Sequence, residues 1–492
     1  MFETAEVGNK IDKATYEKAL PGLRAGLLEA QRGLASSPIA VAVLLGGVEG
    51  AGKADAVNHL LEWMDARGVE THVMGDPTDE ERERPPMWRF WRALPPKGRM
   101  GIFIGTWYTE PIVHKTFGRM GEGRFNSEMD RIAAFEAMLS KEGVLVFKIW
   151  LHIREDTLRK RLKKLASSPA TRWRVNERDW KYLKRYDEFR AVSERALRRT
   201  GTGEAPWHVV EAADPRYRDL TIARLLHAAI LDRLEQEANR PKVKPVPDRP
   251  KPAAVNILRN LDLTQRLSPG RYERSLAKGM SRVNLLTRKL YEKQLSLILV
   301  FEGPDAAGKG GAIRRLTSAM DARNYQHLSV AAPTDEERAH PYLWRFWRAL
   351  PRRGRVTIYD RSWYGRVLVE RVEGFCHREE WERAFAEINA FEESLTEFGT
   401  IVLKFWLALS AKEQLRRFKE REVTPYKQYK ITEEDWRNRA KWDAYEAAAV
   451  QMVDRTSSKN APWVLVEAED KNWARIKVME TVVHYLKSAL ES

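Results

Sequence analysis

The sequence of 492 residues contains one cysteine, Cys376, which excludes an internal disulfide framework and a zinc site built from several cysteines. No apolar run approaches the roughly 18–20 residues that a transmembrane helix needs. The first twenty residues are polar with mixed charge, which is not the pattern of a signal peptide. From these absences we expect no membrane partner and a cytoplasmic location.

The charged residues are unevenly balanced. Lysine and arginine number 85 against 69 aspartate and glutamate residues, which gives a formal net charge of +16. Hydrophobic residues make up 43% of the chain, as in a folded globular protein. A strongly basic globular protein favours a polyanionic partner, which could be nucleic acid, polyphosphate or an anionic membrane surface.

The sequence contains an internal repeat that covers most of the chain. Met87–Pro95 returns as Leu343–Pro351, and Pro77–Arg82 returns as Pro333–Arg338, both at an offset of 256 residues. The same offset relates many other pairs along the chain, so no insertion separates the copies. A period of this length indicates a duplicated domain rather than a solenoid repeat.

Between the copies lies a proline-rich stretch. Five prolines between Pro241 and Pro252 favour an extended linker. We therefore predict a first domain over residues 1–240, a linker over 241–255 and a second domain over 256–492.

Within each copy, short apolar runs alternate with helical patterns, which predicts an α/β fold with a parallel sheet flanked by helices. In the second copy Lys412–Ala449 reads as a basic, Trp-rich helical lid outside the sheet. The predicted strands of this copy are 296–301, 355–359, 400–407 and 462–467, and the predicted helices are 261–294, 312–323 and 379–398.

Gly303–Lys309 fits the pattern G-x-x-x-x-G-K between a strand and a helix. In such a loop the glycines let backbone N–H groups converge on phosphate oxygens, the helix N-terminus adds positive potential and Lys309 supplies a cation. The alternative is a structural glycine turn. Gly310 stands where Ser or Thr usually ligates Mg²⁺, so the metal needs other oxygen ligands. The candidates are Asp305, inside the loop, and Asp360, at the end of the second predicted strand.

Several motifs in order resemble the second polyphosphate kinase family. Glu302–Gly311, Tyr359–Tyr364, Pro333–Arg338 and Val369–Val372 carry the resemblance, and the fused double arrangement is similar to the class of that family that makes ADP from AMP. The resemblance implies tandem P-loop kinase-like domains, each with a helical lid. It also implies Mg²⁺ as cofactor and inorganic polyphosphate and AMP or ADP as small-molecule partners.

The resemblance also implies roles for particular residues. Asp305 and Asp360 would organise Mg²⁺, and Lys309 and Arg361 would act with them in catalysis. The expected phosphate- or polyphosphate-binding residues are Gly303, Gly308, Gly310, Arg366, Arg421, Lys427 and Lys430, and the expected nucleotide-binding residues are Thr334, Arg345 and Glu370.

The first copy has lost the residues that carry chemistry. Its loop Gly47–Lys53 keeps the glycines and the lysine, but Asp305 is matched by Glu49 and Asp360 by Ile104. At the same offset Gly105 replaces Arg361 and Glu110 replaces Arg366. We predict that the first copy keeps the fold without the chemistry, and whether it binds polyphosphate stays open.

The sequence therefore predicts Mg²⁺-dependent transfer of a terminal phosphoryl group from polyphosphate to AMP in the second domain. The alternatives are a polyphosphate kinase acting on ADP or GDP, an ATP-dependent nucleotide kinase and, more remotely, a nucleic-acid-binding P-loop protein. No specific nucleic-acid module is recognised in the chain. A homo-oligomer is also among the partners that we consider.

Overall fold

The computed structural model describes residues 1–241, 243–251 and 255–491. These residues form two compact units. The first unit comprises Met1–Thr78, Met87–Pro241 and Pro333–Arg348. The second comprises the described residues of Asp79–Pro86, Lys242–Ala332 and Ala349–Ser492.

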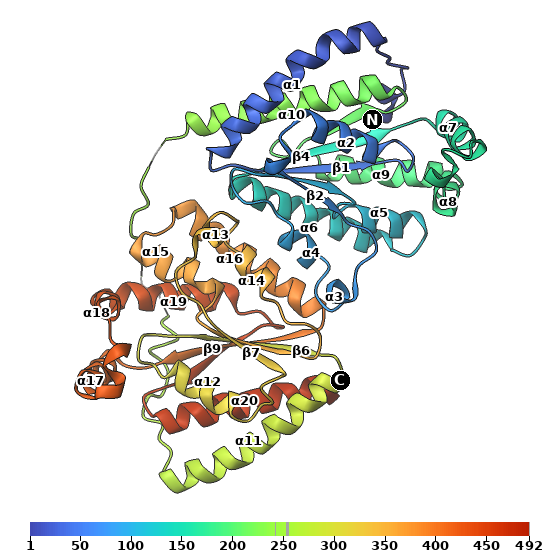
Figure 1. Ribbon diagram of the computed structural model, residues 1–492. Helices are drawn as coiled ribbons and strands as arrows, with labels where there is room; N and C mark the ends of the chain where they lie inside the picture. The colour runs from blue at the N-terminus through green and yellow to red at the C-terminus, as the bar shows by residue number, and fades with distance from the viewer. Residues whose placement is uncertain (242, 252–254, 492) are drawn as a thin grey trace. The chain divides into compact units, whose positions relative to one another are not determined.

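The first unit is built on a parallel sheet of five strands in the order β2-β3-β1-β4-β5 (Figure 1). Its strands are β1 (Ala40–Gly47), β2 (Val69–Val73), β3 (Met100–Ile104), β4 (Val144–His152) and β5 (Trp207–Glu211). The helices of the first repeat are η1 (Phe2–Ala5), α1 (Lys13–Ala35), α2 (Lys53–Trp63), η2 (Ala66–Gly68), α3 (Asp79–Arg82), α4 (Trp88–Arg92), α5 (Thr109–Thr116), α6 (Glu122–Lys141), α7 (Glu155–Ser167), η3 (Arg172–Arg174), α8 (Glu177–Leu183), α9 (Tyr186–Thr200) and α10 (Pro215–Ala238).

The second unit repeats this architecture with a parallel sheet in the order β10-β9-β6-β8-β7 (Figure 1). Its strands are β6 (Ser296–Glu302), β7 (Tyr325–Ser329), β8 (Val356–Asp360), β9 (Thr400–Ala408) and β10 (Trp463–Glu467). The helices of the second repeat are α11 (Pro269–Glu292), α12 (Lys309–Thr317), α13 (Asp335–Arg338), α14 (Trp344–Arg348), η4 (Trp363–Val367), α15 (Val369–Glu373), α16 (Arg378–Glu397), α17 (Ala411–Val423), η5 (Pro425–Lys430), α18 (Glu433–Ala440), α19 (Trp442–Thr456) and α20 (Lys471–Glu491).

The prediction of tandem α/β domains, each with a parallel sheet flanked by helices, is confirmed. One strand was missed: Tyr325–Ser329 is a polar edge strand with largely exposed side chains, so it has no apolar run. The helix predicted over 312–323 was wrong at both ends, because it begins at Lys309 and ends at Thr317. The predicted lid is not one helix; it divides into α17, η5, α18 and α19.

Part of the predicted linker, residues 242 and 252–254, lies outside the described residues. The described stretch 243–251 contains neither helix nor strand. It is nevertheless fastened to helix α15, because Arg371 donates from Nε to the Asp248 carboxylate over 2.7 Å and the Asp248 N–H donates to the Arg371 carbonyl.

The central strand β6 is buried along its whole length. Leu297, Leu299 and Phe301 belong to the core that α11, α12 and α20 cover on one face of the sheet. The neighbouring strand β8 runs parallel to β6, and its last residue, Asp360, pairs with Phe301. The loops that follow the two strands therefore start at the same carboxyl edge, where ligand sites of open α/β sheets lie.

A buried Lys–Glu pair supports each sheet. Lys148 and Glu136 lie 2.6 Å apart in the first unit, and Lys404 and Glu392 lie 2.6 Å apart in the second. In the second unit Tyr364 also donates its hydroxyl to Glu392 over 2.7 Å. Because the unit that lacks the predicted catalytic residues keeps the same pair, we assign it to the fold rather than to chemistry.

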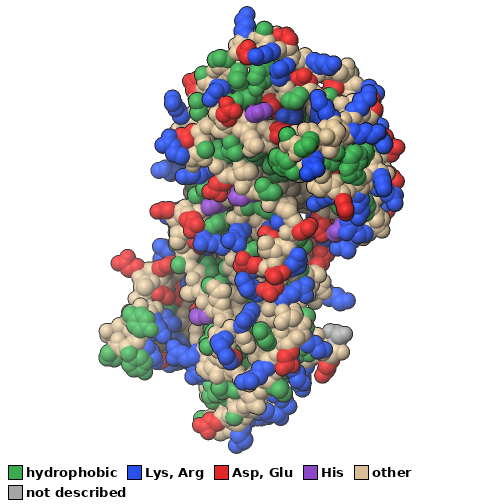
Figure 2. All heavy atoms as spheres, turned by 45° about the vertical axis from the view of Figure 1, so that its right-hand side comes forward, with side chains coloured by type: hydrophobic (Ala, Val, Ile, Leu, Met, Phe, Trp, Pro, Cys, Tyr) green, Lys and Arg blue, Asp and Glu red, His purple; other side chains and the backbone are tan. Residues whose placement is uncertain are grey.

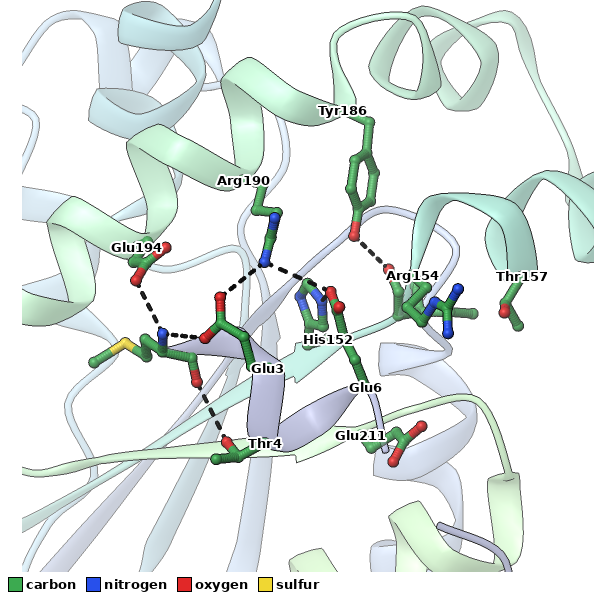
Figure 3. Close-up of polar contacts among 12 residues, drawn as sticks. Glu3, Thr4, Glu6, His152, Arg154, Thr157, Tyr186, Arg190, Glu194 and Glu211 are labelled. Atoms are coloured by element: carbon green, nitrogen blue, oxygen red, sulfur yellow. Dashed lines mark hydrogen bonds and ion pairs between the residues drawn. The ribbon is translucent and has the colours of Figure 1, made fainter. Parts of the chain in front are cut away.

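In the first unit, the N-terminal turn η1 lies against the carboxyl end of strand β4 (Figure 3). The ring of Phe2 in η1 stacks on His152, the last residue of β4, with centroids 4.5 Å apart. Glu6 lies 2.7 Å from Nε2 of the same histidine, whose pKa burial lowers. The matching residue of the second unit is Ala408, so this arrangement belongs to the first unit.

The surface is rich in cations: Lys and Arg side chains are spread over the visible face of both units (Figure 2). No helix among the described residues is long and apolar enough to cross a membrane.

Candidate phosphate site

The loop after β6 has the backbone of a phosphate cradle. Gly303 has φ +141°, and a Cβ there would lie 2.6 Å from the Leu407 carbonyl oxygen, so the position requires glycine. Gly308, with φ +105°, immediately precedes α12. Gly310 follows in the first turn of this helix. The free N–H groups of that turn and the helix dipole have the geometry that would favour an anion at the end of the strand.

Lys309 is folded back over the loop. Its Nζ donates to the Gly303 carbonyl over 2.7 Å and to the Pro304 carbonyl over 3.2 Å, and the residue is only 9% exposed. Burial, and then the nearby Arg361, lower the pKa of Lys309. Within the part of the chain that the structure describes, no carboxylate is hydrogen-bonded to this ammonium group, which leaves it to interact with an anionic ligand.

Asp305 is held from two sides. Arg361 donates to its Oδ1 over 2.6 Å, and the Asn438 side-chain amide donates to its Oδ2 over 2.9 Å. Burial acts to raise the pKa of Asp305, but Arg361, Lys309 and Asn438 outweigh burial and leave the pKa below its ordinary value. The carboxylate is therefore ionised and fixed in orientation.

The backbone of Arg361 is unusual. Its φ is +64°, a left-handed conformation that costs a non-glycine residue about 1–3 kcal/mol. Gly105 occupies the matching position of the first unit with φ +78°. The second unit thus keeps an arginine where the local backbone favours glycine, and this conformation accompanies the ion pair to Asp305.

Asp360 is the last residue of β8. Among the described residues its carboxylate has no hydrogen bond or ion pair. It interacts electrostatically with Lys309 and with Glu302. The predicted metal ligands, Asp305 and Asp360, thus follow neighbouring strands at one edge of the sheet.

Sequence reasoning missed Glu302 as a site residue. This last residue of β6 is buried, accepts a hydrogen bond from Ser362 Oγ over 2.8 Å and interacts electrostatically with Lys309 and Arg361. Burial raises its pKa. The repeat offset contained a usable signal, because the first copy has Gly46 at this position.

A chain of hydrogen bonds behind Asp305 was also missed. The Tyr445 hydroxyl on α19 donates to Glu373 at the end of α15 over 3.2 Å and lies 3.0 Å from Oδ1 of Asn438 on α18. Asn438 in turn donates to Asp305. The first copy replaces Glu373, Asn438 and Tyr445 by Phe117, Tyr182 and Phe189, so the same comparison of copies could have found them.

The other residues predicted from the sequence are engaged in pairs of their own. Arg366, predicted to bind phosphate, lies 2.8 Å from Glu370, predicted to bind the nucleotide, and 3.2 Å from Glu380. On the lid, Lys427 lies 2.7 Å from Glu420, while Arg421 donates to the carbonyl of the exposed Lys430 over 3.0 Å.

The remaining two candidates lie in Pro333–Arg348, a segment grouped with the first unit. Thr334 caps helix α13 by accepting a hydrogen bond from the Glu337 N–H over 3.2 Å. Arg345 lies 3.3 Å from the carboxylate of the same Glu337. Both therefore have a local structural role that is independent of a ligand.

The matching loop of the first unit is neutralised internally. Lys53 lies 2.5 Å from the Glu49 carboxylate, and Lys53 is the largest cause of the lowered pKa of Glu49. Ile104 ends the strand where Asp360 stands in the second unit. Of the two loops, only the loop of the second unit combines a lysine free of carboxylate contacts with two acids at the sheet edge.

Known proteins resemble the chain along its whole length. The polyphosphate:AMP phosphotransferase of Pseudomonas aeruginosa is 52% identical over 497 residues, which cover 99% of both chains. A protein of the same name from Acinetobacter johnsonii is 37% identical over 94% of this chain and 95% of its own. The crystal structure of a putative polyphosphate kinase 2 from Pseudomonas aeruginosa matches with a TM-score of 0.90 at 50% identity and covers all of both chains.

The model of one family accounts for both repeats. The polyphosphate kinase 2 (PPK2) model matches residues 10–238 and again residues 266–492. The two matches together span most of the chain and coincide with the two sheets and their helices. The chain therefore belongs to the polyphosphate kinase 2 family and carries its domain twice.

Proposed function

We propose that this protein transfers the terminal phosphoryl group of inorganic polyphosphate to AMP, forming ADP, and that the second unit performs the reaction. Relatives matched over nearly the whole chain are named polyphosphate:AMP phosphotransferase, which supports this substrate pair. The observation that carries the proposal is the asymmetry of the two loops: among the described residues, Lys309 donates hydrogen bonds to carbonyl oxygens and forms no ion pair, whereas Lys53 is paired with Glu49.

Phosphoryl transfer requires positioning and charge neutralisation more than covalent chemistry. In the proposed mechanism the unpaired backbone N–H groups of the loop 303–310 donate hydrogen bonds to phosphate oxygens, and Lys309 and Arg361 neutralise the charge on the transferred group. Asp305 stays ionised and keeps Arg361 directed at the site. Glu302 accepts a hydrogen bond from Ser362 and so joins the end of β6 to the segment that follows β8.

Mg²⁺ fits the acids of this site. The ion commonly takes one or two carboxylates and completes its shell with phosphate oxygens and water, and the described residues contain no cluster of three or more potential protein ligands. The Asp360 carboxylate has no hydrogen bond or ion pair to any residue that the structure describes, and Asp305 is a second oxygen donor. Bound there, Mg²⁺ would screen the negative charge of the phosphates and orient their oxygens.

We assign the other predicted residues to the two substrates. Arg366 would contact phosphate, and its partner Glu370 would lie on the acceptor side. Thr334 and Arg345 are the remaining candidates for the nucleotide. In the lid Arg421, Lys427 and Lys430 would follow the polyphosphate chain, whose binding should weaken steeply with salt.

The first experiment measures ADP and ATP formation from polyphosphate and Mg²⁺, with AMP and ADP offered separately, for the wild type and Asp360→Asn. We expect rapid ADP formation from AMP and a loss of at least about 10³-fold in Asp360→Asn, since one carboxylate ligand is removed from the charged centre. Product from added ADP alone would favour the alternative kinase of ADP or GDP. No product from either acceptor would favour an ATP-dependent kinase.

Three further expectations stay predictions. We propose a cytoplasmic enzyme that binds no specific nucleic acid, and we leave open a homo-oligomer. Cell fractionation tests the location. Light scattering tests the oligomeric state, and nucleic-acid binding in moderate salt without phosphotransfer would overturn the assignment as an enzyme.

A further inference from the structure

The first unit carries a strongly basic segment that the proposed reaction does not use. We name residues 159–185 the first-unit lid segment; it contains most of α7 together with η3 and α8. It has 11 lysine and arginine residues against two acidic ones. The matching residues of the second unit, 415–441, have nine against five. The copy that lacks the catalytic residues thus has the more positive segment.

The cations of this segment are also less neutralised. In the second unit Arg416 pairs with Glu413 and Lys427 with Glu420. In the first unit Lys160, Lys163 and Lys164 are exposed and form no ion pair with any residue described in the structure. Their ammonium groups are therefore exposed to a ligand in solution, while the Asp156 carboxylate, one turn before Lys160 on the same helix, offsets part of the charge of that lysine.

These three lysines share one face of helix α7. Residues three and four apart are neighbours on a helix, so Lys160 lies beside both Lys163 and Lys164 and the like charges repel one another. A ligand with closely spaced negative charges would relieve this repulsion. A single small anion could neutralise only part of it.

The helix beneath the lysines is firmly placed. Leu158 and Leu162 are buried on its inner side, and Arg161 donates to the carbonyls of Gly50, Ala212 and Ala213. The lysines are therefore presented by a fixed support.

The following turn is fixed as well. Arg174 of η3 donates from Nη2 to both carboxylate oxygens of Asp55 on α2, over 2.8 and 2.9 Å. The second copy has Lys430 and Gly311 at these two positions, so this ion pair cannot form there. The first-unit lid segment is thus fastened to the body of its unit by a contact that the catalytic lid lacks.

We propose that the first-unit lid segment is a docking surface for linear polyphosphate, which it holds without reacting. This inference rests on the proposed function, because polyphosphate is the donor of that reaction. The phosphate loop of the same unit is blocked by the Glu49–Lys53 pair, so the chain would bind to the exposed lysines. A long chain held on the same protein reaches the catalytic unit at a raised effective concentration.

A polyanion with bases fits this surface less well. Proteins that bind single-stranded nucleic acid combine a positive groove with several aromatic side chains on which successive bases stack. In the first-unit lid segment Trp173 is the one large aromatic side chain described as well exposed. The surface therefore favours a chain recognised by charge alone.

The test uses the full-length protein with the triple substitution Lys160→Ala, Lys163→Ala and Lys164→Ala. With AMP saturating, KM is measured for long-chain polyphosphate and for a short oligophosphate. We expect KM for the long chain to rise at least about fivefold, while kcat and the KM for the short donor stay within about twofold, because a short donor cannot span two sites. Circular dichroism and the melting temperature confirm that the variant is folded.

A matched control removes the same charge elsewhere in the first unit, through Lys10→Ala, Lys13→Ala and Lys18→Ala. An equal rise in KM in this control would show a general effect of net charge and would overturn the inference. An unchanged KM for the long chain in the first triple variant would overturn it as well.

A direct binding measurement separates this inference from the proposed function. Fluorescently labelled long-chain polyphosphate is titrated into the wild type and both triple variants without AMP. Weaker binding by the Lys160, Lys163 and Lys164 variant alone supports the docking surface even if the wild type fails to phosphorylate AMP. Single-stranded RNA is then added as a competitor at equal phosphate concentration. If RNA binds more tightly than polyphosphate and displaces it, the surface would instead be assigned to nucleic acid.

Discussion

The side-chain amide of Asn438 donates a hydrogen bond to the Asp305 carboxylate over 2.9 Å and joins helix α18 to the phosphate loop. Tyr445 extends this connection to Glu373 at the end of α15. A carboxylate held by groups on several helices keeps one orientation, and small displacements of reacting groups are costly to rate. We regard Asn438, Tyr445 and Glu373 as positioning residues.

Tyr445→Phe should lower kcat about tenfold with little change in the KM for AMP. The substitution removes one hydroxyl and leaves the ring, so the orientation of Asn438 is lost without a cavity. The check is steady-state kinetics beside Tyr429→Phe, which removes a hydroxyl from an exposed lid residue. Equal kinetics for the two variants would remove Tyr445 from the site.

Asn438→Ala should shift the pH dependence of the reaction. The amide stabilises the charged form of Asp305 and contributes to its lowered pKa, so its removal lets burial raise that pKa. Asp305 must then be ionised at a higher pH, and the acid limb of kcat/KM moves upward. A profile of kcat/KM that extends from pH 8 down to pH 3 tests this; an acid limb that coincides with that of the wild type argues against the assignment.

Arg361→Gly and Arg361→Ala should both lose at least about 10²-fold in kcat, because each removes a cation from the transferred group. They should differ in stability. At φ +64° glycine is unstrained, so the glycine variant should be more stable than the alanine variant by about 1 kcal/mol. Thermal unfolding of the two variants measures this difference, and a more stable alanine variant would show that the backbone at Arg361 is not strained.

Lys404→Met should destabilise the second unit by about 3–5 kcal/mol, because Glu392 is left buried without its partner. Replacing both residues, as Lys404→Met with Glu392→Leu, should recover much of this loss. Lys148→Met is the matched change in the first unit and should destabilise that unit without touching the phosphate site. Urea unfolding and the rate of ADP formation are measured for both single variants. Full activity in the folded Lys404→Met variant would confirm that the Lys404–Glu392 pair is purely structural.

Glu49→Ala with Lys53→Ala should leave kcat within about twofold of the wild type. The two residues neutralise each other in a loop whose strand edge ends in Ile104 in place of an acid. A fall of 10²-fold or more in a folded variant would show that the first unit takes part in the chemistry. Steady-state rates with AMP and polyphosphate decide the question.

The central features of the fold could be predicted because they leave strong sequence signals. Leu297–Phe301 is a continuous apolar strand, and the glycines before Lys309 mark the loop at its end. The polar edge strand Tyr325–Ser329 gives no such signal, since its side chains face solvent. Helix ends such as Thr317 depend on packing that periodicity does not encode.

The candidate site was predictable only in part, for a similar reason. Motifs identify Asp305 and Asp360 because they stand at strand ends and inside a glycine-rich loop. Asn438, Tyr445 and Glu373 come from helices distant in sequence and meet through the fold alone. The pairing of Arg366 with Glu370 likewise depends on side-chain geometry.

The paired positions Arg361 and Gly105 have a consequence for the history of the chain. Both copies hold this residue in the left-handed region, so an arginine there is a standing cost and a glycine removes it. After a duplication, a copy released from selection for turnover would gain stability by drifting toward glycine. The first repeat has glycine at this position, which agrees with such a drift, and the second repeat keeps its arginine at that cost.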